Sequence, residues 1–397
     1  MHTPYRISLF LLSLTLSAAG AAHAAPEYRV TIVGPANSEA KDINRAGVVV
    51  GTYPVSANAT HGFINRGKGL IDLGALGGTS SNAVAINDKG QVLGNWTSRS
   101  GQQRGFIYYQ GRQRDIGAIR GRSTTYTDIN NAGYATLFAG TPYPYDDAGV
   151  RSFLRAPGGT LRDIGRLLSD ENAPSITQAM ALNNRNRITG QSGLGLLPEP
   201  TLRAITWSGG AMRDLGDFGL SSNGGSAING RGQITGYMGM ADNFYERIAF
   251  FYSNGRLIRI DNRPGSETTS RNSEGTGISN HGHVVGTSDH LSGFIWRGRR
   301  MESLNALVDR RLGWDIAEPR AINDAGQIAA TATRAGVQYA VRLDLIRPSV
   351  LAEPDLGEDA DAAIAPDEPA VSPAQAAAEA RVEEEARLRE VVRPVQQ

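Results

Sequence analysis

The chain has 397 residues, of which 40% are hydrophobic, and it contains 48 Gly and no Cys. This length allows a large buried core, and the many glycines predict turns rather than long helices. The lack of Cys excludes disulfide bridges, thiolate zinc sites, a Cys nucleophile and a lipid-modified N-terminal Cys.

Charge is divided unevenly along the chain. Residues 349–397 contain 12 acidic residues and 4 Arg, a net charge of −8, whereas residues 25–348 carry a net charge of +8. A basic body could attract acidic glycans or nucleic acid. No run of Lys and Arg is interleaved with aromatic residues for stacking, so we expect no nucleic-acid partner.

Residues 1–24 have the features of a secretory signal peptide. Arg6 gives a positive start, residues 7–16 are apolar, and the sequence AHA at 22–24 places small side chains at a cleavage site. The apolar run is too short for a comfortable membrane span. We therefore expect export to the periplasm or the extracellular space, and a mature chain with no transmembrane segment.

After this segment the chain is built from seven repeats. One strand, YRVTIV (28–33), precedes the first repeat, and an Ile-Asn motif then recurs at intervals of 43 to 53 residues. The copies are DINRAGVVVG (42–51), AINDKGQVLG (85–94), DINNAGYATL (128–137), ALNNRNRITG (181–190), AINGRGQITG (227–236), GISNHGHVVG (277–286) and AINDAGQIAA (321–330). A period of this length indicates a repeat architecture.

The hydrophobic pattern within each repeat predicts four short antiparallel strands. In the second copy these are NAVAI, QVLGNW, GFIYY and QRDIG, all apolar or alternating and bounded by turn residues. Seven such units over residues 25–348 predict an all-β, seven-bladed β-propeller, which we expect to be a monomeric ring. The seventh repeat lacks a fourth strand, and the strand at 28–33 would supply it and close the ring. A six-bladed ring and an open β-solenoid are the alternatives.

The repeats resemble the HAF-type extracellular repeat family of exported bacterial proteins. The hallmarks of that family appear as AINDKGQVLG, HGF (61–63) and DLGALGG (72–78), and the likeness covers residues 28–343. Several copies are degenerate, because the full DLGALGG form occurs once. The resemblance implies export and a propeller-like repeat fold, and it implies no particular site.

The motif itself predicts a type I turn followed by a left-handed residue. The first turn position holds Asn in six copies and Ser279 in the sixth, and the fourth holds Gly in six copies and Asn186 in the fourth. Both exceptions are residues that the turn geometry accepts. The second position varies from Asp88 to Arg45 and Gly230, which argues against a calcium loop.

Two further positions recur and are predicted to be structural. An Asp in the last strand, replaced in places by a hydroxyl, is expected to bind backbone groups: Asp72, Asp115, Asp163, Asp214 and Asp261, with Ser303 and Thr31 in the remaining copies. Phe residues at one position of the third strand are expected to pack between blades: Phe63, Phe106, Phe153, Phe250 and Phe294.

Function is therefore expected in the parts that vary. The long connections all lie on the face of the ring opposite the motif turns, here called the long-loop face. The candidate ligand-binding residues on it are Tyr143, Tyr145, Asp146, Asp147, Phe244, Tyr245, Trp314 and Asp315. Aromatic platforms beside carboxylates suit sugar or peptide ligands.

No cofactor or catalytic residue is identified. His281 and His283 form a weak candidate metal pair. The position of His281 in a turn argues against this pair. No nucleophile elbow, phosphate loop or dinucleotide fingerprint is present. Beyond the ring, residues 349–397 form an acidic tail that is expected to be disordered, with a helix possible over 373–393.

These features predict a non-enzymatic, exported binding or protein-interaction scaffold of the bacterial envelope or extracellular space. Its partner would be a protein or an extracellular glycan, bound through the long-loop face. The alternative is a propeller hydrolase or lyase that acts on extracellular glycan, which would require carboxylates or His with perturbed pKa values at the central opening. A third possibility is a structural protein tethered by its tail.

Overall fold

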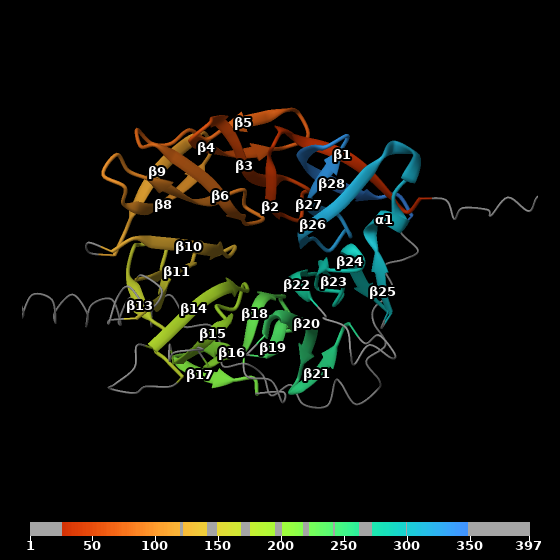
Figure 1. Cartoon of the computed structure of the whole chain (residues 1–397). Coiled ribbons are helices and arrows are strands. Elements are labelled where there is room, and N and C mark those ends of the chain that lie inside the picture. Colours follow the sequence, from red (N-terminus) through yellow and green to blue (C-terminus); the bar gives the residue numbers. More distant parts are fainter. Residues whose placement is uncertain are drawn as a thin grey trace, which may run out of the picture.

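A computed structural model describes residues 26–119, 122–140, 149–167, 175–194, 201–216, 222–240, 243–261, 272–298 and 300–347. The predicted signal peptide and acidic tail lie outside these residues. The chain forms a ring of antiparallel sheets around a central axis (Figure 1). No helix among the described residues is long and apolar enough to cross a membrane.

Three four-stranded blades follow one another at the start of the ring. The first consists of β2 (Glu39–Ile43), β3 (Val49–Ser56), β4 (Ala59–Asn65) and β5 (Leu70–Asp72). The second consists of β6 (Ser80–Ile86), β7 (Val92–Thr97), β8 (Gln103–Tyr109) and β9 (Arg112–Gly117). The third consists of β10 (Thr124–Ile129), β11 (Ala135–Ala139), β12 (Arg151–Arg155) and β13 (Leu161–Asp163).

The next two repeats share one eight-stranded sheet, here called the double sheet. Its strands are β14 (Ser175–Leu182), β15 (Ile188–Leu194), β16 (Thr201–Ser208), β17 (Ala211–Asp214), β18 (Ser222–Ile228), β19 (Ile234–Met240), β20 (Asn243–Ser253) and β21 (Arg256–Arg259). A single parallel pair, Leu202 with Ser222, joins β16 to β18. The structure thus has five separate four-stranded blades and does not support the predicted count of seven.

The last two sheets complete the ring. One contains β22 (Ser273–Ile278), β23 (Val284–Ser288), β24 (Ser292–Arg297) and β25 (Arg300–Ser303), followed by the short helix α1 (Leu304–Leu307) and a 3-10 turn at Arg310–Leu312. The other contains β26 (Trp314–Ile322), β27 (Ile328–Arg334) and β28 (Val337–Leu345), with β1 (Tyr28–Ala36) as its fourth strand. The N-terminal strand therefore closes the ring as predicted, with Tyr28 opposite Leu345.

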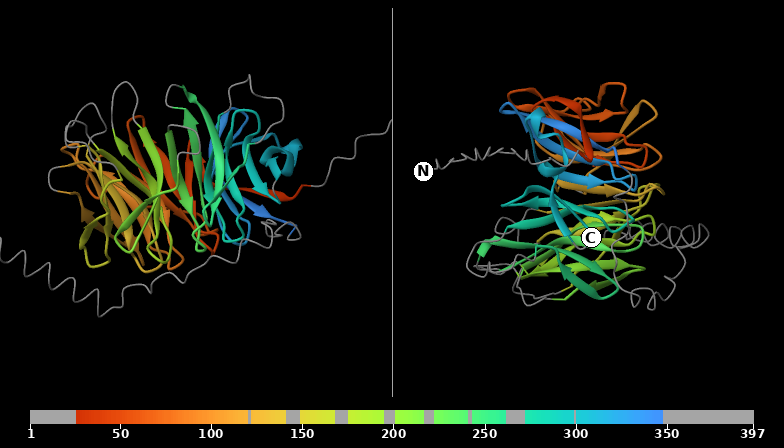
Figure 2. Two further views of the ribbon diagram at one scale, coloured as in Figure 1. Left: turned by 90° about the horizontal axis from the view of Figure 1, so that it is seen from below. Right: turned by 90° about the vertical axis from the view of Figure 1, so that its right-hand side faces the viewer.

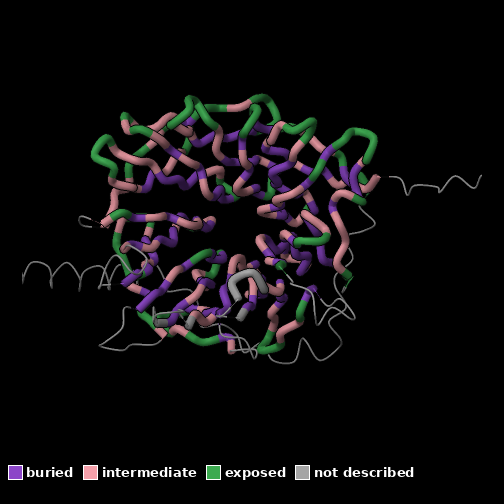
Figure 3. The backbone as a smooth tube through the Cα atoms, viewed as in Figure 1, coloured by how far each residue is buried: buried purple, intermediate pink, exposed green. Residues whose placement is uncertain are grey.

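Hydrophobic side chains fill the spaces between neighbouring blades. Figure 3 shows buried backbone toward the middle of the ring and exposed backbone along its rim. Phe106 packs against Val50 and Ile64 of the preceding blade, and Phe63, Phe106, Phe250 and Phe294 are fully buried. The prediction of an inter-blade core is confirmed for these four, whereas Phe153 is only partly buried.

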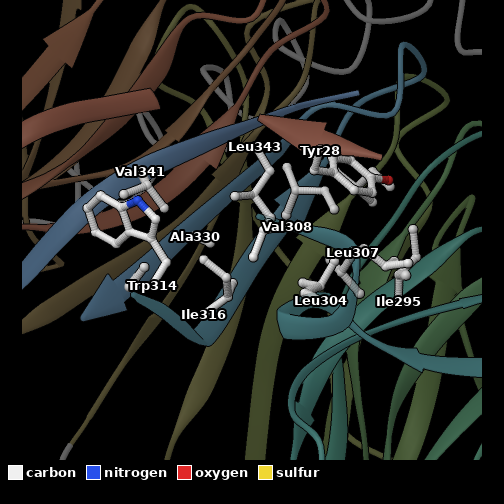
Figure 4. Packing of buried hydrophobic residues seen from close by; sticks show 14 residues of the cluster. Tyr28, Ile295, Leu304, Leu307, Val308, Trp314, Ile316, Ala330, Val341 and Leu343 are labelled. Carbon is white, nitrogen blue, oxygen red and sulfur yellow. The ribbon is translucent and has the colours of Figure 1, made fainter. Parts of the chain in front are cut away.

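The closing sheet has the largest of these clusters (Figure 4). Tyr28 from β1 packs with Leu343 from β28 and with Leu304 and Leu307 from α1. Beside the cluster, the buried guanidinium of Arg297 pairs with Glu27 at 2.6 Å and with Glu302 at 3.0 Å. These contacts fix the start of the described chain to the sheet that precedes the closing one.

Each inner strand contains at least one β-bulge, for example between Ala83 and Ala85 of β6, and β26 contains two register shifts. The bulge brings the inner strand so close to the next one that a Cβ on Gly94 would lie 2.3 Å from both Asn82 O and the Phe106 ring. This approach accounts for the last Gly of the motif in five copies, whereas the third and seventh copies have Leu137 and Ala330 at this position. The sequence analysis assigned no role to this Gly.

The recurring Asp of the outer strand has a local role. Asp72, Asp115, Asp163 and Asp214 each accept a hydrogen bond from the N–H of the Gly two residues later. The predicted alignment is wrong in two copies, because Arg259 lies opposite Phe250 and Ile32 lies opposite Val341. Asp261 and Thr31 therefore do not belong to this set.

Candidate functional site

The seven motif turns meet at the axis of the ring, at the end of the inner strands β2, β6, β10, β14, β18, β22 and β26 (Figures 1 and 2). They line a polar pocket of about 220 Å³, to which all seven copies contribute residues. This volume is smaller than that of ordinary small-molecule pockets, which span roughly 300–1,000 Å³. The face on which this pocket opens is here called the turn face.

The turn geometry is the predicted one. The fourth position has a positive φ in every copy, including 56° at Asn186 and 78° at Gly90. Asn87 Oδ1 accepts hydrogen bonds from the N–H groups of Lys89 and Gln91 at 3.1 and 2.9 Å. The Asn side chain therefore caps its own turn.

The same Asn also joins neighbouring repeats, which the sequence analysis missed. Asn87 Nδ2 donates to the backbone O of Asn130, the same position of the next repeat, at 2.8 Å. Equivalent bonds run from Asn44, Asn130, Asn183, Asn229 and Asn323, the last of which donates to Asn44 O across the closure. Ser279 has no amide to donate, so this ring of hydrogen bonds, the Asn ring, has one break.

The second turn position adds an outer layer. Asp88 accepts from the backbone N–H of Arg45, and Asn131 accepts from that of Asp88. In the same way, the backbone N–H groups of Asn131, Gly230 and Asn280 donate to the side chains of Asn184, Asn280 and Asp324, respectively. Gly230 has no side chain and Arg45 no acceptor, so two junctions lack this bond. The side chains at the turn face are thus largely occupied with one another.

Two buried carboxyls lie beside the Asn ring, one residue before the Ile of their motifs. Asp42 accepts from the N–H of Ile86 in the next blade, and Asp128 accepts from that of Leu182, both at 2.8 Å. Burial raises the pKa of Asp42 to about 8 and that of Asp128 to about 6. Although both residues keep some accessible surface, backbone donors enclose their oxygens, so loss of solvation governs the pKa.

Further along the inner strands, on the half nearer the long-loop face, charged side chains pair within one strand. Lys41 lies 2.6 Å from Glu39, and Arg320 lies 2.6 Å from Glu318 in the closing sheet. The hydrogen bond from Lys41, followed by the charges of Lys41 and Arg320, lowers the pKa of Glu39 despite its partial burial. Glu39 is therefore ionised and is not a proton donor at neutral pH.

A connected polar network lies on the other side of the ring, on strands β15, β19 and β20 of the double sheet and on the inner strand β22 of the next blade. Tyr237 Oη donates to Gln191 at 2.7 Å, and Arg247 lies over the Tyr237 ring at 4.2 Å. Arg247 also pairs with Glu274 at 3.3 Å. Gly224 leaves room for this network, because a Cβ there would lie 2.7 Å from the Tyr237 ring.

The network lies away from the turn face. Glu274 is four residues before Ile278, which enters the axial pocket, and four strand residues span about 13 Å. Tyr237, Arg247 and Glu274 therefore combine an aromatic ring, a guanidinium and a carboxylate on the half of the ring nearer the long loops. None of the three was singled out from the sequence. Residues 237–247 and 262–275 were expected to form long connections, whereas Tyr237, Arg247 and Glu274 lie within β19, β20 and β22.

Only some of the predicted ligand residues lie in the described part of the chain. Those of the loop at 143–147, namely Tyr143, Tyr145, Asp146 and Asp147, lie outside the described residues. Phe244 and Tyr245 fall within β20. Trp314 packs in the closing cluster beside Tyr339, with Arg334 over its ring at 5.4 Å, and Asp315 accepts hydrogen bonds from Ser292 and Asn305. The described part of the chain does not bring these candidates together.

The two members of the weak metal pair lie close together, and their role as a metal site stays a prediction. His283 is buried, with 1% of its surface exposed, and its ring centroid lies 6.0 Å from that of His281. Among the described residues, the metal-ligating side chains that converge in a group of three are instead Asp261, Asp289 and His290.

Comparisons with known proteins bear on the fold. No protein-family profile and no curated protein matches this sequence. The β-propeller domain of the Trilobed protease from Pyrococcus furiosus aligns with a TM-score of 0.51 and 9% identity, over 78% of this chain and 96% of that one. The fold is a β-propeller. That relative is described as having an open velcro topology, whereas here β1 pairs with β28.

Other similar structures are more distant. TolB from Acinetobacter baumannii aligns with a TM-score of 0.42 and 7% identity, over 75% of this chain and 65% of that one. YCF48 bound to D1 peptide aligns with a TM-score of 0.47 and 9% identity, over 81% of this chain and 98% of that one. At such identities the propeller likeness concerns the fold and not the function.

Proposed function

We propose that this protein is a binding scaffold whose partner, a protein or an extracellular glycan, contacts the long-loop face. The observation that carries the proposal is the contrast between the two ends of the axis. At the turn face the Asn side chains are consumed by the Asn ring. Toward the long-loop face, Tyr237, Arg247 and Glu274 form a partly exposed group of aromatic, cationic and anionic side chains.

A binding role accounts for the carboxylates better than hydrolysis does. Asp42 and Asp128 are the carboxyls with raised pKa values in the described part of the chain, and both are bound to backbone N–H groups near the turn face. Toward the long-loop face, Glu39 has a lowered pKa and Glu274 is paired with Arg247. A glycosidase needs one carboxyl kept protonated near its substrate, and these pairs supply none.

Several finer features are part of the proposal. The double sheet acts as two blades, since it contributes two members, Asn183 and Asn229, to the Asn ring and is joined by one residue pair only. The ring then has seven repeats, in line with the HAF-type resemblance. A signal peptide at 1–24 would direct the chain to the periplasm or the extracellular space. The loop residues Tyr143, Tyr145, Asp146 and Asp147, together with Phe244, Tyr245, Trp314 and Asp315, remain proposed parts of the binding face.

The test uses the chain from residue 25 to 397, biotinylated and applied to an array of bacterial polysaccharides and to an array of peptides. Affinity for the strongest array ligand is then measured for Arg247→Gln and Glu274→Gln. Each should bind about tenfold more weakly, the loss of roughly 1.4 kcal/mol. The matched control is Lys89→Gln, an exposed charge on the turn face.

Two results would count against the proposal. A Lys89→Gln variant that loses affinity as strongly as Arg247→Gln would place the contact on the turn face. Release of new reducing ends from an arrayed polysaccharide would favour the hydrolase or lyase instead. Circular dichroism spectra of all three variants should match that of the unmodified chain, which separates lost contacts from lost folding.

A further inference from the structure

Three metal-ligating side chains converge where the double sheet meets the next blade, on the long-loop face. Asp261 follows β21, and Asp289 and His290 lie in the turn between β23 and β24. One donor atom from each residue lies within 4.8 Å of the donor atoms of the other two. Donors bound to a common ion at about 2.0–2.2 Å lie roughly 3–4 Å apart, so a small contraction suffices.

The three residues depart from the repeat at this place. Ile260 donates its N–H to Ala249 O, as Leu73 does to Gly62 O in the first blade. Asp261 therefore takes the position that Gly74 has there. Gly74 has a φ of 59°, whereas Asp261 has no positive φ. The repeat alone does not require a carboxylate at this position.

The geometry of the group is held by contacts outside it. The backbone N–H of Asp289 donates to Asn272 O at 2.9 Å, which fixes the turn against the strand that follows Asp261 in the chain. Ser288 Oγ lies 2.9 Å from His290 Nδ1, and Asp289 Oδ1 lies 3.8 Å from the same nitrogen, so these contacts hold the imidazole beside Asp289.

Burial separates this group from an ordinary surface cluster of acids. Asp261 has only 1% of its surface exposed, whereas Asp289 and His290 are exposed. Asp261 also makes a polar contact within the chain, so its burial alone does not require an ion, and the convergence of the three donor atoms carries the proposal. An imidazole nitrogen and two carboxylate oxygens, with one side open to solvent, form the donor set of a three-ligand transition-metal site.

We propose that Asp261, Asp289 and His290 bind a divalent transition metal such as Zn²⁺. The nitrogen donor disfavours Ca²⁺ and Mg²⁺, which prefer oxygen ligands alone. The three protein ligands leave a coordination position that faces the solvent on the long-loop face. This site is independent of the proposed binding role and of the Tyr237 network.

The test is isothermal titration of the metal-free chain, residues 25–397, with ZnCl₂. We expect one bound Zn²⁺ per chain, and at least a tenfold loss of affinity in His290→Ala and in Asp289→Asn. Both substituted residues are exposed, so these variants should fold. His281→Ala is the matched control, because His281 lies in the same sheet but outside the group, and it should bind Zn²⁺ as the unmodified chain does.

Three results would contradict the proposed metal site or its assignment to a transition metal. Absence of stoichiometric Zn²⁺ binding to the unmodified chain would overturn the proposal, as would equal loss in His281→Ala and His290→Ala. Tighter binding of Ca²⁺ than of Zn²⁺ would overturn the assignment to a transition metal. A second measurement, the Tm with and without Zn²⁺, should show an increase in the unmodified chain and in His281→Ala only.

Discussion

Replacing Asn87 by Ala tests whether the Asn ring stabilises the propeller. The side chain is 4% exposed. Its amide donates to Asn130 O and Gln91 Oε1, and its oxygen accepts from the N–H groups of Lys89 and Gln91. Each hydrogen bond contributes roughly 0.5–1.5 kcal/mol net, and the four share one side chain. We expect Asn87→Ala to lower the free energy of unfolding by about 2–5 kcal/mol.

The sixth repeat supplies a matched control at the same position. Ser279 is equally buried but accepts one long hydrogen bond, from the N–H of His283 at 3.3 Å, and has no amide for the next repeat. Ser279→Ala should therefore cost only about 0.5–1 kcal/mol. Urea unfolding followed by circular dichroism measures both variants on the same scale. Equal losses in Asn87→Ala and Ser279→Ala would refute the view that bonds between repeats, rather than the turn alone, matter here.

Two further predictions follow from the same part of the ring. Ser279→Asn should supply the missing donor to Asn323 O and raise the free energy of unfolding by about 0.5–1.5 kcal/mol, and an unchanged or lower urea midpoint would contradict this. Asp42 and Asp128, with pKa values of about 8 and about 6, hold protons that the unfolded chain releases near pH 4, so stability should fall as pH rises from about 4 to 8. Asp42→Asn should flatten this decline between pH 6 and 8, and an unchanged slope in Tm against pH would show that Asp42 is not protonated in the folded chain.

The repeating pattern allowed much of the fold to be predicted. Turn residues such as Asn186 and Gly90 have narrow backbone preferences, so their recurrence indicated the hairpin correctly. The strand at 28–33 was assigned to the last sheet because the seventh repeat lacked a fourth strand, and its pairing with β28 confirms this. Local geometry of this kind depends on residues close in the sequence, so it can be predicted from a single sequence.

Relations between repeats were harder to predict. The sequence shows that Asn87 can cap a turn, but the bond from its amide to Asn130 O depends on how two blades are placed. The alignment of the last strand failed at Arg259 because the pattern LIRID resembles LIDLG when shifted by two residues. Likewise the pair Leu202–Ser222, which joins two repeats into one sheet, depends on tertiary packing alone.

The candidate site was predicted least well. Aromatic residues in long connections were expected to bind ligand, but Trp314 is largely buried in the closing cluster. Residues 237–247 were expected to form a long connection, from which Phe244 and Tyr245 were selected, whereas Tyr237 and Arg247 lie within β19 and β20 and meet only when these strands pair. Asp261 was assigned to a structural series, so its proximity to His290 was not foreseen.

The pairing of β1 with β28 also affects how the chain folds. Thr31 donates to Asp344 across 313 residues of sequence, so the last sheet cannot be completed until nearly the whole ring has been synthesised. Contacts of such separation form slowly, because the entropy lost in closing the loop precedes the energy gained. The first strand must therefore wait unpaired, with a free edge open to strands of other chains. Self-association during refolding should depend on protein concentration, and adding an excess of a peptide with the sequence of β28 should slow the closing step.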